Sequence, residues 1–325
     1  MVPRHASRHG ERLPMKPTVL QIGALLPLVE KGIAENYTLH RLPPAPDRDR
    51  FLAEHGAGIV AVASSNRDGI RAELMDALPN LRIVTHFGVG YDTVDVEHAH
   101  RRGIVVTNTP DVLTDCVADL AIALMVDVAR GITAGDRYVR QGRWLAGPMP
   151  LARKVSGKRL GVLGLGRIGR AVAARAEGFD MEIRYHNRRR VPEVAYAFEH
   201  TLSDLARWSD FLVVATAGGE ATRGLVSAGV LEALGPEGFL INIARGSVVD
   251  EPALVSALQD RRIAGAALDV FADEPRVPEA LFALDNVVLT PHIASATTDT
   301  RAAMGQLVLD NLASWFQEGR ALTPV

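Results

Sequence analysis

The sequence of 325 residues contains a single cysteine, Cys116, so no disulfide can form within one chain. Such scarcity is typical of proteins in a reducing compartment, and we expect a cytoplasmic protein. No apolar run reaches the roughly 18 residues that a membrane-spanning helix needs. Neither charge dominates, since 36 Lys and Arg oppose 38 Asp and Glu, for a net charge of -2. We therefore expect no membrane and no nucleic acid as a partner. We also expect no metal site.

The first fifteen residues contain Arg and His but lack the apolar segment of a secretory signal. We interpret residues 1–15 as a disordered extension, with Met15 as an alternative start. A transit peptide is the other interpretation.

The most informative motif is GVLGLGRIG, residues 161–169. It joins a short apolar run, typical of a buried parallel strand, to an Ala-rich helical pattern. The order of strand, G-x-G-x-x-G and helix predicts a dinucleotide-binding turn. Gly164 permits the tight turn, Gly166 lets a pyrophosphate approach the backbone, and Gly169 lets the helix pack on the strand. The alternative is a glycine-rich turn that merely packs tightly.

Strand and helix patterns alternate on both sides of this motif. Four short apolar runs precede it, at 18–22, 58–63, 81–85 and 104–106, and five follow its own strand, at 182–185, 211–215, 239–243, 265–270 and 287–290. Such alternation predicts βαβ units and parallel sheets. The predicted fold class is α/β, with two doubly wound parallel-sheet domains. Because ligands of such sheets bind beyond the carboxyl ends of the strands, residues just after each strand are candidates for a site.

Asn187 follows the second strand of the nucleotide-binding series, 23 residues after Gly164. A carboxylate at this point would bind the ribose hydroxyl of NAD, but here Asn187 precedes three arginines, including Arg188 and Arg189. Arginine pairs with a 2′-phosphate, so the sequence favours NADPH, with NADH possible. The alternative is a solvated basic turn.

Four more candidate residues lie at the end of a strand or just after one in the second half. Arg245 can present its guanidinium to a substrate carboxylate, or simply cap the sheet edge. Asp269 can accept a hydrogen bond from a nicotinamide carboxamide, or cap a turn. Glu274 and His292 each follow a strand, so the two can meet although eighteen residues separate them. A histidine charged by a carboxylate is the general acid that carbonyl reduction requires.

The motifs GLGRIGRAVA, NIARGSVVDEPAL, GAALDVFADEP and NVVLTPHIASAT, in this order, resemble those of the D-isomer-specific 2-hydroxyacid dehydrogenases. The resemblance extends from about Thr18 to Val325. The segment VTNTPDVLTDCVADLAIALM and the loop FGVGYD are most similar to the branch of hydroxypyruvate/glyoxylate and hydroxyphenylpyruvate reductases.

The resemblance implies roles for individual residues. Arg245, Glu274 and His292 would be catalytic, and substrate contacts would come from Ser64, Val89, Gly90, Arg245 and Trp144. Trp144 would reach the active site of a partner subunit in a homodimer; the alternative is a locally packed tryptophan. Cofactor contacts would come from Gly164, Gly166, Arg167, Ile168, Gly169, Asn187, Arg188, Arg189, Ala244 and Asp269.

The resemblance also implies a discontinuous, flavodoxin-like substrate domain, residues 16–107 and 293–325, and a Rossmann domain, residues 108–292. The expected reaction is NADPH-dependent reduction of a small 2-oxo acid, glyoxylate or hydroxypyruvate, to the D-2-hydroxy acid. Hydroxyphenylpyruvate, 2-ketogluconate and pyruvate are alternative substrates. An alternative of another class is a regulator that senses nucleotides with the same fold.

Overall fold

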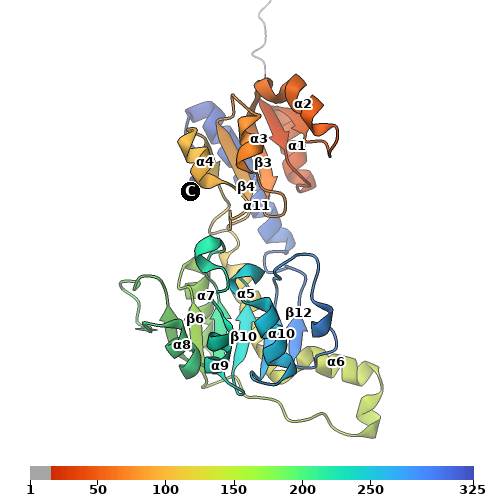
Figure 1. Ribbon diagram of the computed structural model, residues 1–325, viewed down its shortest axis with the longest axis vertical. Helices are drawn as coiled ribbons and strands as arrows, with labels where there is room; N and C mark the ends of the chain where they lie inside the picture. The colour runs from red at the N-terminus through yellow and green to blue at the C-terminus, as the bar shows by residue number, and fades with distance from the viewer. Residues whose placement is uncertain (1–15) are drawn as a thin grey trace, which may run out of the picture. The chain divides into compact units, whose positions relative to one another are not determined.

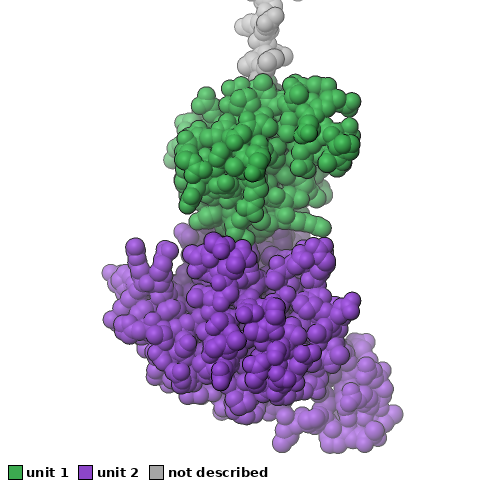
Figure 2. Space-filling model, in the orientation of Figure 1, with its two compact units in different colours: residues 1–109, 304–325 green, residues 110–303 purple. Residues whose placement is uncertain are grey.

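The computed structural model describes residues 16–325, and the expected extension, residues 1–15, lies outside the described residues. Two compact units, coloured separately in Figure 2, make up this chain. Unit 1 comprises residues 16–109 and Met304–Val325, and unit 2 comprises Pro110–Ala303. The predicted substrate domain (residues 16–107 and 293–325) and nucleotide domain (residues 108–292) stay predictions. A division into compact units does not say which ligand each unit binds.

Unit 1 contains a five-stranded parallel sheet in the order β2-β1-β3-β4-β5. Figure 1 labels two of its strands, β3 and β4. Its strands are β1 (Thr18–Gln21), β2 (Thr38–Arg41), β3 (Ile59–Ser65), β4 (Ile83–Phe87) and β5 (Val105–Thr107). Its helices are α1 (Pro27–Asn36), α2 (Arg48–His55), the short η1 (Gly56–Gly58), α3 (Ala72–Asp76), α4 (Val96–Arg101) and most of α11 (Thr298–Glu318). β4 is buried along its whole length, as expected of an inner parallel strand.

Two features of unit 1 differ from the sequence prediction. β2 was not predicted, because this edge strand is half exposed and its residues, TLHR, form no apolar run. β4 was predicted to end at Thr85, but it continues through His86 and Phe87. The extension brings a histidine into the sheet, where it pairs in register with Ser64 of β3.

Unit 2 contains a seven-stranded parallel sheet in the order β12-β11-β10-β9-β6-β7-β8. Its strands are β6 (Arg159–Leu163), β7 (Glu182–His186), β8 (Ala197–Phe198), β9 (Phe211–Val214), β10 (Phe239–Asn242), β11 (Gly265–Leu268) and β12 (Val287–Leu289). Its helices are α5 (Thr114–Arg130), α6 (Ile132–Arg140), α7 (Arg167–Glu177), α8 (Leu202–Trp208), α9 (Ala228–Leu234) and α10 (Glu251–Gln259). Short helices lie at η2 (Arg143–Ala146), η3 (Glu220–Thr222), η4 (Gly246–Val248) and η5 (Glu279–Leu281).

Apolar side chains hold the helices of unit 2 against its sheet. α8, α9 and α10 share a core with the strands, to which Leu205, Leu231 and Leu258 contribute wholly buried side chains. Each such side chain stabilises the fold by about 1.5–3 kcal/mol relative to an exposed one. α5 packs on α7 and on β10, β11 and β12. The two parallel sheets with interleaved helices confirm the predicted α/β fold class. Like β2 of unit 1, the two-residue edge strand β8 of unit 2 was not predicted.

The strand order of unit 2 reverses between β6 and β9. All of its strands are parallel, so their carboxyl ends lie along one edge of the sheet. A ligand of such a sheet binds outside that edge, at the point of reversal. Within residues 16–325, no helix combines the length and apolar character needed to cross a bilayer.

Candidate active site

The glycine-rich turn lies directly after β6, at the reversal of strand order. Gly164 has a φ of 97°, and a Cβ atom on it would lie 2.7 Å from the backbone of Thr216. A Cβ on Gly169 would lie 2.0 Å from the Gly164 carbonyl oxygen. Gly166, by contrast, has no atom within 4 Å of its Cβ position. The turn is thus closed where helix meets strand and open at its middle glycine, which fits a pyrophosphate at the N-terminus of α7.

A hydrogen bond joins the residue after β7 to this turn. The side-chain Oδ1 of Asn187 accepts a hydrogen bond of 2.7 Å from the Leu165 N–H. Arg188 and Arg189 follow and are exposed, and neither forms an ion pair with an acidic side chain in the part of the chain that the structure describes. Two cations beside the turn fit the phosphate of NADP, and their cofactor contacts stay predictions.

The first turn of α7 holds two more residues predicted to contact the nucleotide, Arg167 and Ile168. The Arg167 Nε lies 2.7 Å from Asp111 Oδ1, in a pair whose side chains are both exposed. Ile168 is half-buried. An exposed ion pair contributes little to stability, so this contact leaves Arg167 able to turn toward a bound phosphate.

Asp269 is wholly buried and organises the segment that carries His292. Its carboxylate accepts hydrogen bonds from the Thr290 hydroxyl (2.7 Å) and from the N–H groups of Ile293 (2.8 Å) and Ala294 (2.9 Å). Its carbonyl oxygen accepts one from the His292 N–H (2.9 Å). These bonds hold His292 at a φ of 54°, which is uncommon outside glycine. Asp269 does cap a turn here, and its predicted contact with nicotinamide stays a prediction.

The structure brings Glu274 and His292 together. The His292 Nδ1 lies 2.7 Å from Glu274 Oε2, and the other carboxylate oxygen accepts a 3.1 Å hydrogen bond from the Phe271 N–H. About a third of each paired side chain is exposed (34% for His292 and 35% for Glu274). The His292 Nε2 has no partner among residues 16–325, so it is the nitrogen that can exchange a proton with a substrate.

The electrostatics of the pair favour an ionised Glu274. Burial raises the pKa of this carboxyl, but the net effect leaves the pKa below its ordinary value. The pKa is lowered by the hydrogen bond and charge of His292, by the Phe271 N–H and by the charge of Arg245. Because the folded-state pKa is lowered, the stability that Glu274 contributes is complete above the ordinary carboxyl pKa. It is lost only as the pH falls through the lowered value.

Arg245 lies just beyond β10, in a loop pressed against the one that leads to Glu274. A Cβ atom on Gly246 would lie 1.9 Å from the backbone of Phe271. The Arg245 Nη1 donates a 2.8 Å hydrogen bond to the Ala244 carbonyl oxygen, and Ala244 is buried. The three side chains predicted for catalysis thus share one edge of the sheet of unit 2, and the Arg245 charge is close enough to act on Glu274.

The loop after β4 lies in unit 1 and contains two of the residues predicted to bind substrate. The Val89 carbonyl oxygen accepts a 2.9 Å hydrogen bond from Asn108 Nδ2, whereas the N–H groups of Val89 and Gly90 have no acceptor within residues 16–325. These donors can bind a carboxylate, which is the role predicted for them. Ser64 is wholly buried, and its hydroxyl contacts His86 Nδ1 at 3.1 Å. Its predicted contact with substrate stays a prediction.

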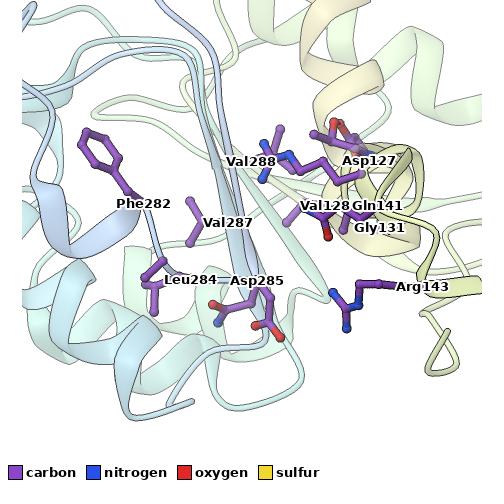
Figure 3. Close-up of a pocket in the computed structure, with 15 residues that line it drawn as sticks. Asp127, Val128, Gly131, Gln141, Arg143, Phe282, Leu284, Asp285, Val287 and Val288 are labelled. Carbon is purple, nitrogen blue, oxygen red and sulfur yellow. Dashed lines mark hydrogen bonds between the residues drawn. The ribbon is translucent and has the colours of Figure 1, made fainter. Parts of the chain in front are cut away.

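Trp144 lies in η2 and is 68% exposed, so its own chain covers only a minor part of the side chain. Its predicted contact with the active site of a partner subunit stays a prediction. A cavity of about 200 Å³ lies near this segment, between α5, α6 and residues 282–288 (Figure 3). Asp127, Arg143 and Asp285 are among its lining residues. None of the residues predicted for catalysis or cofactor binding lines it, so this cavity is separate from the candidate site.

Comparison with known proteins shows what this chain is similar to. Residues 122–294 match the family model described as D-isomer specific 2-hydroxyacid dehydrogenase, NAD binding domain. Hydroxyphenylpyruvate reductase of Plectranthus scutellarioides is 48% identical over 94% of this chain and 98% of its own length. The 2-ketogluconate reductase of Gluconobacter oxydans is 43% identical over 95% and 99%.

A solved structure extends the comparison to three dimensions. It is the NADPH-dependent glyoxylate/hydroxypyruvate reductase of Sinorhizobium meliloti in complex with NADP and malonate. The TM-score is 0.88 at 46% identity, with 95% of this chain and 97% of that chain covered. The likeness therefore spans both units, each of which has its counterpart in a reductase of known structure.

Proposed function

Because the chain belongs to the D-isomer-specific 2-hydroxyacid dehydrogenases, we propose that it reduces glyoxylate or hydroxypyruvate to the D-2-hydroxy acid with NADPH. The observation that carries the proposal is the 2.7 Å pair of His292 and Glu274, with the charge of Arg245 acting on it. An imidazole held by a carboxylate beside a guanidinium is suited to protonate a carbonyl oxygen near an anionic substrate.

Each group has a separate task in this mechanism. When bound, NADPH supplies the hydride. The N–H groups of Val89 and Gly90 bind the substrate carboxylate, and Arg245 binds the substrate and polarises its keto oxygen. His292 holds a proton at Nε2 and delivers it to the alkoxide that forms, while the bond at Nδ1 to Glu274 orients the ring and stabilises its charge.

A panel of 2-oxo acids tests this proposal. Loss of reduced nicotinamide absorbance is followed with glyoxylate, hydroxypyruvate, 4-hydroxyphenylpyruvate, 2-ketogluconate and pyruvate, each with NADPH and with NADH. We expect the highest kcat/KM for glyoxylate or hydroxypyruvate with NADPH. If kcat/KM is highest for one of the other acids, that acid is the substrate instead. Nucleotide binding without turnover of any acid would favour the nucleotide-sensing regulator.

The preference for NADPH over NADH rests on the turn after β7. Asn187 carries no charge to repel a 2′-phosphate, and its Oδ1 is already bonded to the Leu165 N–H. Arg188 and Arg189 provide exposed guanidinium groups next to it. A hydrogen bond to a charged group is worth about 1.5–3 kcal/mol, so one such contact is enough for a clear preference.

We expect Arg188→Ala to raise KM for NADPH by about 10- to 100-fold and to leave KM for NADH nearly unchanged. The variant loses a contact that only the 2′-phosphate can make. Steady-state kinetics with both cofactors measure it. Arg190→Ala, in the same exposed turn, is the matched control and should have little effect. Equal effects of Arg188→Ala on the two cofactors would favour the solvated-turn interpretation.

We also propose that the enzyme is a cytoplasmic homodimer. The segment after α6 exposes large apolar side chains: Trp144 is 68% exposed, Leu145 96% and Leu151 fully. Phe282, which lines the neighbouring cavity, is 62% exposed (Figure 3). Apolar side chains gathered on one extended segment are typical of an association surface. Burial against a second copy would remove them from water.

The double variant Leu145→Asp/Leu151→Asp is expected to dissociate this dimer. Burying two leucines stabilises the dimer by about 3–6 kcal/mol in total. The dissociation constant of the dimer should therefore rise by about 100-fold or more. Light scattering at several protein concentrations gives the molar mass. Leu28→Asp, at a 43% exposed leucine of unit 1, should leave the mass unchanged. A wild-type chain that is monomeric at all concentrations would refute the proposal.

A further inference from the structure

A histidine that the proposed mechanism does not use is wholly buried at the end of β4. The ring of His86 has partners at both nitrogens. Nδ1 lies 3.1 Å from the Ser64 hydroxyl, and Nε2 lies 2.6 Å from Asn66 Oδ1 and 3.0 Å from the Gly90 carbonyl oxygen. A buried imidazole is costly unless its nitrogens are hydrogen-bonded, so this network is what permits His86 at this position.

The partners determine which nitrogen carries the proton. A carbonyl oxygen can only accept a hydrogen bond, so the contact with Gly90 requires a proton on Nε2 of His86. Nδ1 then accepts a hydrogen bond from the Ser64 hydroxyl. The N–H of Nε2 is thereby left for Asn66 and Gly90.

The carbonyl oxygen of Gly90 is one of three successive carbonyl oxygens that accept hydrogen bonds in this loop. The carbonyl oxygens of Gly88 and Val89 accept hydrogen bonds of 2.9 Å from the Thr109 N–H and from Asn108 Nδ2. In a planar trans peptide the carbonyl and the N–H of the next residue point in opposite directions. Each anchored carbonyl therefore turns the N–H of the next residue, 89, 90 or 91, away from the group that holds the carbonyl. Within residues 16–325 these N–H groups have no acceptor.

The lack of a side chain at Gly88 leaves space for the hydrogen bonds of His86. Gly88 has a φ of 155°, and a Cβ atom on it would lie 2.1 Å from Asn66 Oδ1. A side chain at this position would therefore displace the amide that contacts His86. The absence of a side chain, the buried ring and the outward N–H groups are parts of a single arrangement.

We propose that His86 is a positioning residue for the substrate carboxylate. By holding the Gly90 carbonyl, it keeps the Tyr91 N–H turned outward as a third donor beside those of Val89 and Gly90. This inference rests on the proposed reduction of a 2-oxo acid. It adds that the affinity for the carboxylate depends on a side chain that never touches the substrate.

A pair of amide substitutions tests the contacts that His86 makes through Nε2, with Asn66 and with Gly90. In His86→Gln the side-chain NH₂ takes the place of Nε2 and can still donate to Gly90. In His86→Asn the NH₂ takes the place of Nδ1, next to Ser64, and the contacts with Asn66 and Gly90 are lost. We expect His86→Asn to raise both KM for glyoxylate and the inhibition constant of oxamate by about 10-fold or more, with kcat and the NADPH dissociation constant nearly unchanged. His86→Gln should stay near the wild type.

The matched control is Thr85→Val, at the preceding residue of β4. Thr85 is also wholly buried, and its hydroxyl donates a 3.2 Å hydrogen bond to the Val62 carbonyl oxygen, away from the loop. It should lower the melting temperature without changing KM. An equal rise of KM in Thr85→Val, or an unchanged KM and oxamate constant in His86→Asn, would overturn the proposal.

One further measurement separates this inference from the proposed function. Oxamate binding to the wild-type protein with NADPH bound is measured by calorimetry, and the two amide variants are compared in the same way. If no 2-oxo acid is reduced, the proposed function fails, yet weaker binding to His86→Asn alone would still support the positioning role. Turnover by the wild type together with equal oxamate affinity in all three proteins would refute the positioning role alone. Should His86→Asn fail to fold, weak oxamate binding to a folded His86→Gln would count against the proposal.

Discussion

Replacing His292 with alanine should lower kcat for 2-oxo acid reduction by about 100- to 10,000-fold, the range associated with a positioned general acid. The variant leaves the alkoxide without a proton donor, since the Nε2 of His292 is removed. The dissociation constant for NADPH should stay close to that of the wild type, because the glycine turn after β6 is untouched. Steady-state kinetics and fluorescence titration with NADPH measure the two effects separately.

His98 supplies a matched control within the same protein. Its Nε2 lies 2.8 Å from Asp76 Oδ1, so it forms a histidine–carboxylate pair of similar length to that of His292, but on α4 of unit 1. His98→Ala should keep kcat near the wild-type value. If His292→Ala also turned over at nearly the wild-type rate, the assignment of the general acid would be wrong.

Arg245→Gln should lower kcat/KM by about 100- to 1,000-fold, since an anion in a desolvated site loses its charged partner. A second effect follows from Glu274, whose pKa the Arg245 charge helps to lower. Without that charge the pKa of Glu274 rises, so the carboxylate is protonated sooner as the pH falls. The acid limb of the kcat/KM profile should therefore move to higher pH.

Arg245→Lys separates charge from geometry. Lysine keeps the positive charge but not the planar fork of five donors. The acid limb should remain near its wild-type position, while most of the loss in kcat/KM should persist. A lysine variant as active as the wild type would show that the charge alone is sufficient and that the fork is not used.

Several site residues were identified in the sequence because they follow strands. Glu274 and His292 are an example, since each comes just after a predicted strand of one parallel sheet. Parallel strands bring their carboxyl ends to the same edge, so the meeting of the two was foreseeable without knowing any distance. The glycine turn was foreseeable for a similar reason, because its three glycines, strand and helix are adjacent in the chain.

Other features depend on contacts that no local pattern encodes. His86 was missed because the apolar run of β4 ends at Thr85, and its partners Ser64 and Gly90 lie on either side of it in the chain. The edge strand β2 was missed for the opposite reason, since its polar residues pair with β1 without forming an apolar run.

The sequence by itself determined the alternation of strands and helices, the dinucleotide turn and the order of the residues that follow each strand. These depend on periodicity and on neighbours within a few positions, which any window of the sequence contains. Only the tertiary structure decided that Asp269 holds the His292 segment, that Ser64 contacts His86 and that the carbonyls after β4 are anchored. Those contacts join residues up to about twenty-five positions apart, and strand register and burial select the partner of each polar group.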